Sequence, residues 1–381
     1  MILPSVAGND FGIQAVNPEE WAGSSLIQEA SLQQIAPFVG KTKCTMARNL
    51  ILAFSHEGET VLDPFCGCGV IPFEALVLGR HAIGSDLSPY AYVITRAKLF
   101  APASLREALS LAERYLAKAE ALCDKVEVGD VPRWVASFFH KRTLQEIIAL
   151  FTLLRAHEQW FLLGCMLGIL HHVRPGFLSF PASHLTPYLR KEKYPPEDFP
   201  EMYEYRDVRS RLLAKVERMY RRPVVISSQL RRAVLVEDAQ SLPIERCSVD
   251  AIISSPPYFD ALDYGRDNRL RLWFLGVHDY RLLNGSLITR RSSYTEEMTK
   301  CLMEMYRVLK SGRWCVLILG DVHKNGTMRR TAEVIAGIAQ SLPRPFVVEG
   351  IINDSIPDIR RSRRGTQTTV ADRILVLRKP Q

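Results

Sequence analysis

The chain lacks the features of a secreted or membrane-spanning protein. Residues 1–21 contain no basic region followed by an apolar stretch, so we expect no secretory signal. The most apolar segment, Trp160–Leu170, is too short to cross a bilayer and is expected to be a buried helix. No internal repeat or low-complexity tract is apparent. These absences favour a cytoplasmic globular protein without a membrane partner.

Cysteine pairs suited to a metal site are also missing. Of the eight cysteines, only Cys66 and Cys68 lie close together in the sequence. A tetrahedral zinc site needs four ligands, and no second pair completes these two. We therefore expect no metal, and the scattered cysteines indicate a reducing compartment.

The composition is ordinary for a globular protein, but the charge balance is basic. The 381 residues, 47% hydrophobic and 24% charged, allow one large domain with an insertion or two domains. The net charge of +8 is compatible with a polyanionic partner. A basic run over residues 206–222 also fits the solvated face of an amphipathic helix. A denser cluster suits phosphate contacts and is expected to bind nucleic acid: Arg360, Arg361, Arg363 and Arg364.

Alternating strand and helix patterns begin after an irregular arm. Helices are predicted over residues 45–55, 71–78 and 90–99, and strands over 60–62 and 81–86. This alternation is typical of a parallel sheet. From residue 102 to about 222 the strands stop and apolar-periodic helices follow, which predicts an inserted helical subdomain.

Strand patterns return after the insertion. They are predicted over residues 233–236, 250–254, 314–319, 346–352 and 373–377, and the last two are expected to form a terminal hairpin. The predicted fold class is α/β, a Rossmann-like sheet that is mostly parallel and closed by an antiparallel C-terminal pair. The expected division is an arm (1–36), a first half of the sheet domain (37–100), the helical insertion (101–230) and a second half (231–381).

A glycine turn follows the first predicted strand, in the sequence Asp63-Pro64-Phe65-Cys66-Gly67-Cys68-Gly69. Its glycines let the backbone approach a ligand that faces the next helix N-terminus. A dinucleotide fingerprint needs a third glycine where this chain has Pro72, which tells against a nicotinamide enzyme. Asp63 would repel phosphates and suits a cationic ligand with an ammonium or sulfonium centre.

Two more aspartates follow predicted strands. Asp86, at the end of the second strand, is expected to accept hydrogen bonds from ribose hydroxyls, with a helix cap or turn as its alternative role. Asp238, after the third strand, is expected near the amino group of an adenine.

A rigid loop follows the strand predicted over 250–254, in the sequence Ser254-Ser255-Pro256-Pro257-Tyr258. Its two prolines fix φ and remove two backbone N–H donors, so carbonyl oxygens and a hydroxyl remain as acceptors. Tyr258 adds a stacking surface. This set suits a nucleobase with an exocyclic amine, although a plain proline-rich turn explains the loop taken alone.

Together with residues 79–86, these motifs resemble the amino-group DNA methyltransferases. The resemblance covers residues 37–100 and 231–320. It implies S-adenosyl-L-methionine as the cofactor, with residues 37–41 packed over its methionine end. The implied cofactor-binding residues are Asp63, Phe65, Gly67, Gly69, Asp86 and Asp238. The implied catalytic residues, which would hold the target base, are Ser255, Pro256, Pro257 and Tyr258, and residues 259–264 would line the rim.

The implied reaction is direct in-line methyl transfer to a flipped DNA base. Ser255 resembles the enzymes that modify cytosine N4, whereas adenine N6 enzymes usually carry aspartate there. Adenine-N6 methylation, RNA base N-methylation and a nucleic-acid-binding protein on a degenerate methyltransferase fold stay open as alternatives. DNA is the expected partner, RNA is the alternative, and a cognate restriction enzyme would be a further partner. Residues 101–230 are a candidate target-recognition region.

Overall fold

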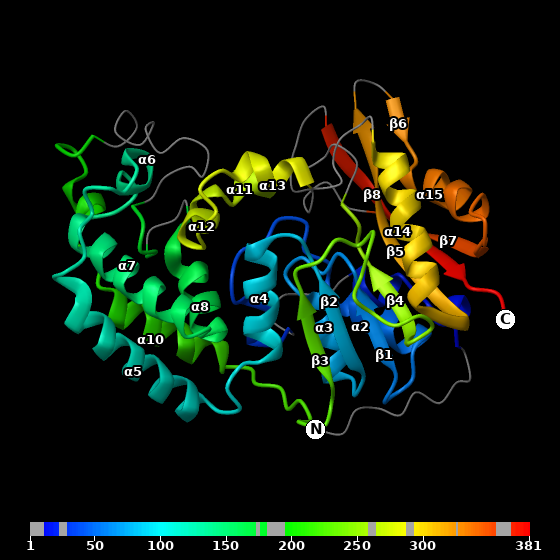
Figure 1. Cartoon of the computed structure of the whole chain (residues 1–381), viewed down its shortest axis with the longest axis horizontal. Helices are drawn as coiled ribbons and strands as arrows, with labels where there is room; N and C mark the ends of the chain where they lie inside the picture. The colour runs from blue at the N-terminus through cyan, green and yellow to red at the C-terminus, as the bar shows by residue number, and fades with distance from the viewer. Residues whose placement is uncertain are drawn as a thin grey trace.

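A computed structural model shows a mixed sheet covered by helices on both faces, with a helical insertion at one side (Figure 1). The structure describes residues 11–22, 29–172, 176–180, 195–257, 264–286, 293–324, 327–355 and 367–381.

The sheet has eight strands among the described residues, in the order β3-β2-β1-β4-β5-β8-β7, with β6 paired to β5. Neighbours from β3 to β5 are parallel, and β5, β8 and β7 are antiparallel. The predicted Rossmann-like sheet with its antiparallel C-terminal pair is therefore confirmed. The strands are β1 Thr60–Asp63, β2 His81–Ser85, β3 Arg232–Leu235, β4 Val249–Ser254, β5 Leu309–Lys324, β6 Thr327–Arg329, β7 Val347–Ser355 and β8 Gln367–Arg378.

Alternate residues of the central strands enter two separate hydrophobic cores. In β5, Val316 and Ile318 belong to one core, whereas Leu317 and Leu319 belong to the other. Successive side chains of a strand point to opposite faces, so the two cores lie on opposite faces of the sheet. The first core includes α2 Cys44–Phe54, α3 Val70–Val77 and α4 Pro89–Leu99, and the second includes α14 Tyr294–Val308 and α15 Thr331–Gln340.

The predicted helical insertion packs around one apolar helix, α8. Residues 161–170 of α8 are all buried, which confirms the helix expected from the apolar run. α8 packs against α4 of the sheet domain, so the insertion shares the first core. Its helices are α5 Leu105–Cys123, α6 Arg133–Ala136, α7 Lys141–Ala156, α8 Trp160–Leu170, η4 Pro200–Tyr203 and α10 Val208–Met219. No helix of the described part is long and apolar enough to cross a membrane.

The basic run at residues 206–222 is only partly a solvated helix face. Arg206 is buried and donates to the carbonyl oxygens of Phe177 and Ser179 at 2.8 and 3.1 Å. Lys215 is also buried and donates to the carbonyl oxygen of Gln34 at 3.0 Å. These two cations hold backbone segments together, and neither lies on a solvated face.

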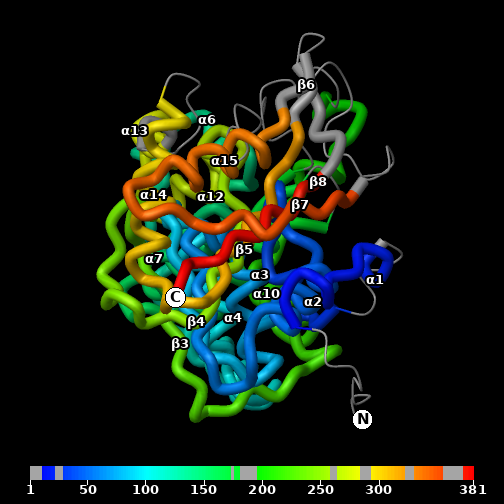
Figure 2. The backbone as a smooth tube through the Cα atoms, turned by 90° about the vertical axis from the view of Figure 1, so that its right-hand side faces the viewer, coloured from blue at the N-terminus to red at the C-terminus, as the bar shows by residue number. Residues whose placement is uncertain are grey.

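The described part of the predicted N-terminal arm packs along the sheet domain. It contains η1 Ile13–Ala15, α1 Glu19–Ala22 and η3 Ser31–Gln34. Trp21 is fully buried, and its indole Nε1 donates to Asp354 Oδ2 of β7 at 2.9 Å. Figure 2 shows α1 beside α2, close to β7 and β8, the last strands of the chain.

The described residues between β4 and α14 form three short helices: α11 Tyr264–Asp267, α12 Arg269–Phe274 and α13 Tyr280–Ser286. In Figure 1, α12 lies beside α8 of the insertion, and α11 and α13 lie above α4, between the insertion and the sheet. The described residues that follow 258–263 thus include a helix, α12, beside the insertion.

Candidate active site

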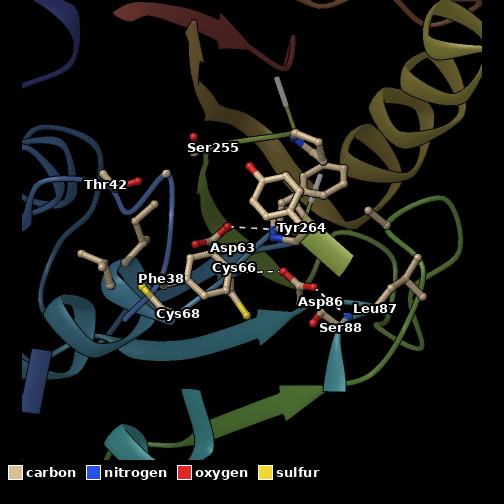
Figure 3. A pocket seen from close by; sticks show the side chains of 18 of the residues that line it. Phe38, Thr42, Asp63, Cys66, Cys68, Asp86, Leu87, Ser88, Ser255 and Tyr264 are labelled. Atoms are coloured by element: carbon tan, nitrogen blue, oxygen red, sulfur yellow. Dashed lines mark hydrogen bonds between the residues drawn. The ribbon is translucent and has the colours of Figure 1, made fainter. Parts of the chain in front are cut away.

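A cavity lies where β1, β2, β3 and β4 end (Figure 3). In a parallel sheet this edge is where ligands bind. Four parts of the chain line the cavity: the stretch before α2, the loop after β1, the ends of β2 and β3, and the segments on either side of residues 258–263. Segments as far apart in the sequence as those of Phe38 and Asn268 therefore meet at one site.

The glycine turn after β1 forms the floor of the cavity. Gly67, with φ of +49°, lines the cavity, and a Cβ atom there would lie 3.0 Å from Cε1 of Phe38. Gly69, with φ of +71°, does not line the cavity but forms the left-handed N-cap of α3. A Cβ at Gly69 would lie 2.6 Å from Oγ1 of Thr95. The sequence thus needs glycine at both positions, for different reasons.

Asp86 connects the end of β2 to the glycine turn. Its Oδ2 accepts a hydrogen bond from the Gly67 backbone N–H at 2.9 Å, and its Oδ1 accepts one from the Ser88 N–H at 2.9 Å. The carboxylate also lines the cavity. Burial raises the pKa of Asp86 to about 6. Asp86 therefore combines the turn geometry and the cavity position that its two predicted roles require.

Asp63, at the end of β1, is buried beside the same cavity. Its Oδ1 accepts hydrogen bonds from Ser254 Oγ at 2.6 Å and from the Phe65 N–H at 3.2 Å. Burial raises the pKa of Asp63 to about 7, against the effect of these two hydrogen bonds, and the charge of Asp86 adds to the increase. Two carboxylates that are costly to ionise together favour a ligand with positive charge.

Asp238 and Phe65 complete the predicted cofactor residues, and both line the cavity. The Asp238 carboxylate accepts hydrogen bonds from the backbone N–H and the side-chain amide of Gln240, at 2.9 and 3.1 Å. Of the six predicted cofactor-binding residues, only Gly69 lies outside the cavity lining.

The loop after β4 brings Ser255 and Pro257 to the cavity. The Ser255 hydroxyl donates to the carbonyl oxygen of Ile318 on β5 at 3.3 Å. The Pro257 carbonyl accepts from Tyr294 OH at 3.4 Å. Pro256 is buried and is not part of the cavity lining.

Three groups of predicted residues lie outside the described part of the chain. The first is the stacking residue, Tyr258. The second is residues 259–263 of the rim segment, of which only the next residue, Tyr264, is described. The third is the basic cluster: Arg360, Arg361, Arg363 and Arg364.

Aromatic rings from both sides of the cavity meet over the glycine turn. The Phe38 and Tyr264 ring centroids are 6.2 Å apart, and the Phe38 ring stacks on Tyr90 at 5.9 Å. Both positions lie in segments that the sequence indicates. Thr42 and Asn268 also line the cavity but were not predicted, since neither belongs to a motif or follows a predicted strand.

The residues that line the cavity fit S-adenosyl-L-methionine, the cofactor that the sequence resemblance implies. The Phe38 ring lies against Gly67, where a Cβ would be 3.0 Å from its Cε1, so glycine lets an aromatic ring close over the turn beside the cavity. The carboxylates of Asp63 and Asp86 suit a ligand that carries a sulfonium centre and ribose hydroxyls.

Comparisons with known proteins bear on the same segment. Residues 41–96 match the N6/N4 methyltransferase family, described as DNA methylase. A comparison with curated proteins gave no match.

Several solved structures with a similar arrangement are named as methyltransferases. An S-adenosylmethionine-dependent methyltransferase from Methanosarcina mazei is 11% identical, with 87% of this chain and 98% of that chain covered and a TM-score of 0.35. An rRNA methylase from Streptococcus thermophilus is 8% identical, with 90% and 98% covered and a TM-score of 0.35. A proposed DNA modification methylase from Thermus thermophilus, determined with S-adenosyl-L-methionine, is 19% identical, with 38% of this chain and 51% of that chain covered and a TM-score of 0.25. At these identities and scores, none of the three carries a conclusion about the substrate.

The family match spans the Phe65–Gly69 turn, the carboxylates of Asp63 and Asp86, and most of the helix after β2. The resemblance to the amino-group DNA methyltransferases, read from the sequence, is therefore confirmed over residues 41–96.

Proposed function

We propose that this protein methylates an exocyclic amino group of a DNA base, cytosine N4 in preference to adenine N6, with S-adenosyl-L-methionine as the methyl donor. The observation that carries the proposal is the direction of the Ser255 hydroxyl. Its proton goes to the Ile318 carbonyl at 3.3 Å, so the lone pairs of Oγ remain to accept a hydrogen bond at the cavity.

An acceptor at this position suits an amine substrate. An exocyclic amine presents two N–H donors, and its lone pair is delocalised into the ring. If Ser255 Oγ and the backbone carbonyl of Pro256 accept these N–H bonds, the nitrogen is drawn towards tetrahedral geometry and its lone pair becomes available. The prolines keep this loop free of competing backbone donors. Tyr258 is proposed to stack on the base.

The cofactor residues have separate proposed roles. Asp86 would bind the ribose hydroxyls, and Asp238 the adenine amino group. Asp63, Phe65 and Gly67 would hold the methionine end, and Gly69 would act through the turn that places them. When bound, the cofactor supplies a methyl group on a sulfonium centre. The methylated amine is positively charged until it loses a proton to water, and the Ser255 oxygen stabilises that charge.

The nucleic-acid side of the proposal rests on charge and topology. The net charge of +8 favours a polyanion, and α12, which follows the base-binding loop, is hydrogen-bonded to α8 of the insertion through Arg271. We propose residues 37–100 as the cofactor-binding half, 231–381 as the catalytic half, and 101–230 together with the basic cluster at 360–364 as the DNA-contacting parts. A cognate restriction enzyme and a cytoplasmic location stay predictions.

Product identification tests the proposal. The full-length protein would be incubated with methyl-labelled S-adenosyl-L-methionine and unmodified DNA or RNA, and the labelled nucleoside identified after digestion. We expect N4-methylcytosine from DNA. Label on adenine N6 would replace the cytosine assignment, and label in RNA alone would overturn the DNA assignment. Cofactor binding with no transfer to either polymer would favour a binding protein.

A serine pair supplies the matched control. Ser255→Ala should lower kcat by about 100-fold while cofactor affinity stays the same, because the oxygen acts on the amine alone. Ser248→Ala, just before the start of β4, removes a hydroxyl that bonds only to Glu245 in the described structure. It should leave kcat unchanged. Equal kcat in the two variants would contradict the role given to Ser255.

A further inference from the structure

The last turn of α8, in the insertion, contacts both segments that place aromatic rings over the glycine turn. Arg271 of α12 is buried, and it donates to the Leu167 carbonyl through Nε at 3.2 Å and to the His171 carbonyl through Nη2 at 2.7 Å. Between these acceptors lies Gly168, where a Cβ would be 2.0 Å from the carbonyl oxygen of Ile35. One helical turn therefore contacts chain segments about 235 residues apart in sequence.

The segment before Phe38 is wedged against the insertion. Because Gly168 has no side chain, the Ile35 backbone reaches the surface of α8. Lys215 of α10 donates to the Gln34 carbonyl at 3.0 Å, which fixes the same segment from a second helix. Only two residues separate Ile35 from Phe38, so the insertion sets the position of the Phe38 ring.

The segment after Tyr264 is fixed by Arg271. Asn268 Nδ2 donates to the Tyr264 carbonyl at 3.0 Å, and the Leu272 N–H donates to the Asn268 carbonyl at 2.9 Å. These bonds make α11 and α12 one continuous unit that Arg271 attaches to α8. The attachment therefore determines where Tyr264 and Asn268 enter the cavity.

The two segments also meet through Tyr90. The Arg271 guanidinium lies 5.7 Å from the Tyr90 ring centroid, and Tyr90 stacks on Phe38 at 5.9 Å. The Tyr90 hydroxyl donates to the Pro37 carbonyl. Arg271 thus affects the positions of both the Phe38 and the Tyr264 rings. It attaches the α11–α12 unit to α8, and its guanidinium lies beside the Tyr90 ring, on which Phe38 stacks.

We propose that the last turn of α8 positions Phe38 and Tyr264 over Gly67, so that the helical insertion is a structural part of the cofactor site. Arg271 and Gly168 are its positioning residues. This inference rests on the proposed cofactor. It predicts that changes in the insertion weaken cofactor binding without touching a residue of the cavity lining.

Calorimetry with S-adenosyl-L-methionine alone, on the whole chain, tests the proposal. Gly168→Ala would push Ile35 off α8, and we expect cofactor affinity to fall about tenfold. Gly337→Ala is the matched control, since Gly337 is also helical but has open space around its Cβ position. Its affinity should equal that of the unmodified protein. Arg271→Lys keeps the charge but loses the paired geometry, and it should also weaken binding about tenfold.

A double-mutant cycle separates positioning from general destabilisation. In a Phe38→Ala background there is no ring left to position at that side, so the effect of Gly168→Ala should largely disappear. An effect of the same size with and without Phe38 would overturn the proposal. Equal affinities in the unmodified protein, Gly168→Ala and Arg271→Lys would also overturn it. If the unmodified protein itself fails to bind the cofactor, the proposed function fails instead. Should Gly168→Ala not fold, Arg271→Lys in both backgrounds gives the same comparison.

Discussion

At the scale of single residues, the site depends on carboxylates held where ionisation is costly. Asp63 is 2% exposed and its Oδ1 already accepts two hydrogen bonds, yet burial still raises its pKa to about 7. A cationic ligand would favour the ionised form. The pKa shift therefore links cofactor binding to pH.

We predict that affinity for S-adenosyl-L-methionine rises as pH increases from about 5.5 to 8. The pKa of Asp63 in the folded chain, about 7, lies above its ordinary value of 3.8. The stability that protonation gives the free protein is thus present at low pH and lost as pH rises through about 7. Ligand binding has the opposite dependence, because it needs the ionised carboxylate. At pH values below about 7, where Asp63 is mostly protonated, calorimetry should show the affinity rising by up to about tenfold per pH unit.

Asp63→Asn is the control for this pH dependence. An amide cannot ionise, so we expect weaker binding at pH 8 and a much flatter pH profile, with only the contribution of Asp86 left. A wild-type affinity that stays constant between pH 5.5 and 8 would show that ionisation of Asp63 is not coupled to the ligand.

The sequence predicts most residues of the cavity, for a local reason. Asp63 ends β1, Gly67 lies in the turn after it, and Asp86 and Ser255 directly follow β2 and β4. Strand prediction alone therefore brings these four residues to one edge of the sheet. Asn268 could not be predicted this way, because it reaches the cavity only through the contact of α12 with α8.

At the scale of secondary-structure elements, the glycines predict the turn between β1 and α3. The alternation of strands and helices predicts that the strands around this turn belong to a parallel sheet. The basic run at 206–222 shows the limit of periodicity. Helical spacing placed α10 correctly, but it could not reveal that Lys215 meets a backbone carbonyl of a distant segment. Lys215 can be buried because a backbone carbonyl from another part of the fold accepts its hydrogen bond.

Two glycines with positive φ allow the turn to be tested. Gly58→Ala, at φ +80° with nothing within 4 Å, should cost about 1–2 kcal/mol from backbone strain alone. Gly69→Ala, at φ +71°, adds the clash with Thr95 and should cost roughly 2–5 kcal/mol. Urea unfolding measures both. Equal losses in the two variants would mean that the turn relaxes away from α4.

At the scale of the whole molecule, the described N-terminal residues close against the last strands of the sheet. Trp21 donates to Asp354, which also accepts from Lys43 Nζ at 3.2 Å. The sequence did not predict this contact, since an isolated tryptophan in a segment without periodicity gives no sign of its partner.

Trp21→Phe should lower the free energy of unfolding by about 1–3 kcal/mol, because the buried Asp354 carboxylate loses a donor. Trp134→Phe is the control. Trp134 is half-buried under the Arg269 guanidinium, and a phenyl ring keeps that contact. Unfolding in guanidinium chloride should show a clearly smaller loss of unfolding free energy for Trp134→Phe than for Trp21→Phe. Equal losses would indicate that ring volume, not the hydrogen bond, explains the effect of Trp21→Phe.

The place of β1 between β2 and β4 has a consequence for synthesis of the chain. Thr60 at the start of β1 donates to Asp250 of β4, 190 residues later. At ribosomal speeds those residues take roughly 10–40 s to make. During that time β1 has an unpaired apolar edge, of the kind that other chains can join. The helical insertion is made in this interval and packs on α4, so a nascent chain can form a compact helical body before the centre of its sheet exists. We expect slow translation between β2 and β4 to be the stage at which this protein is most prone to aggregate.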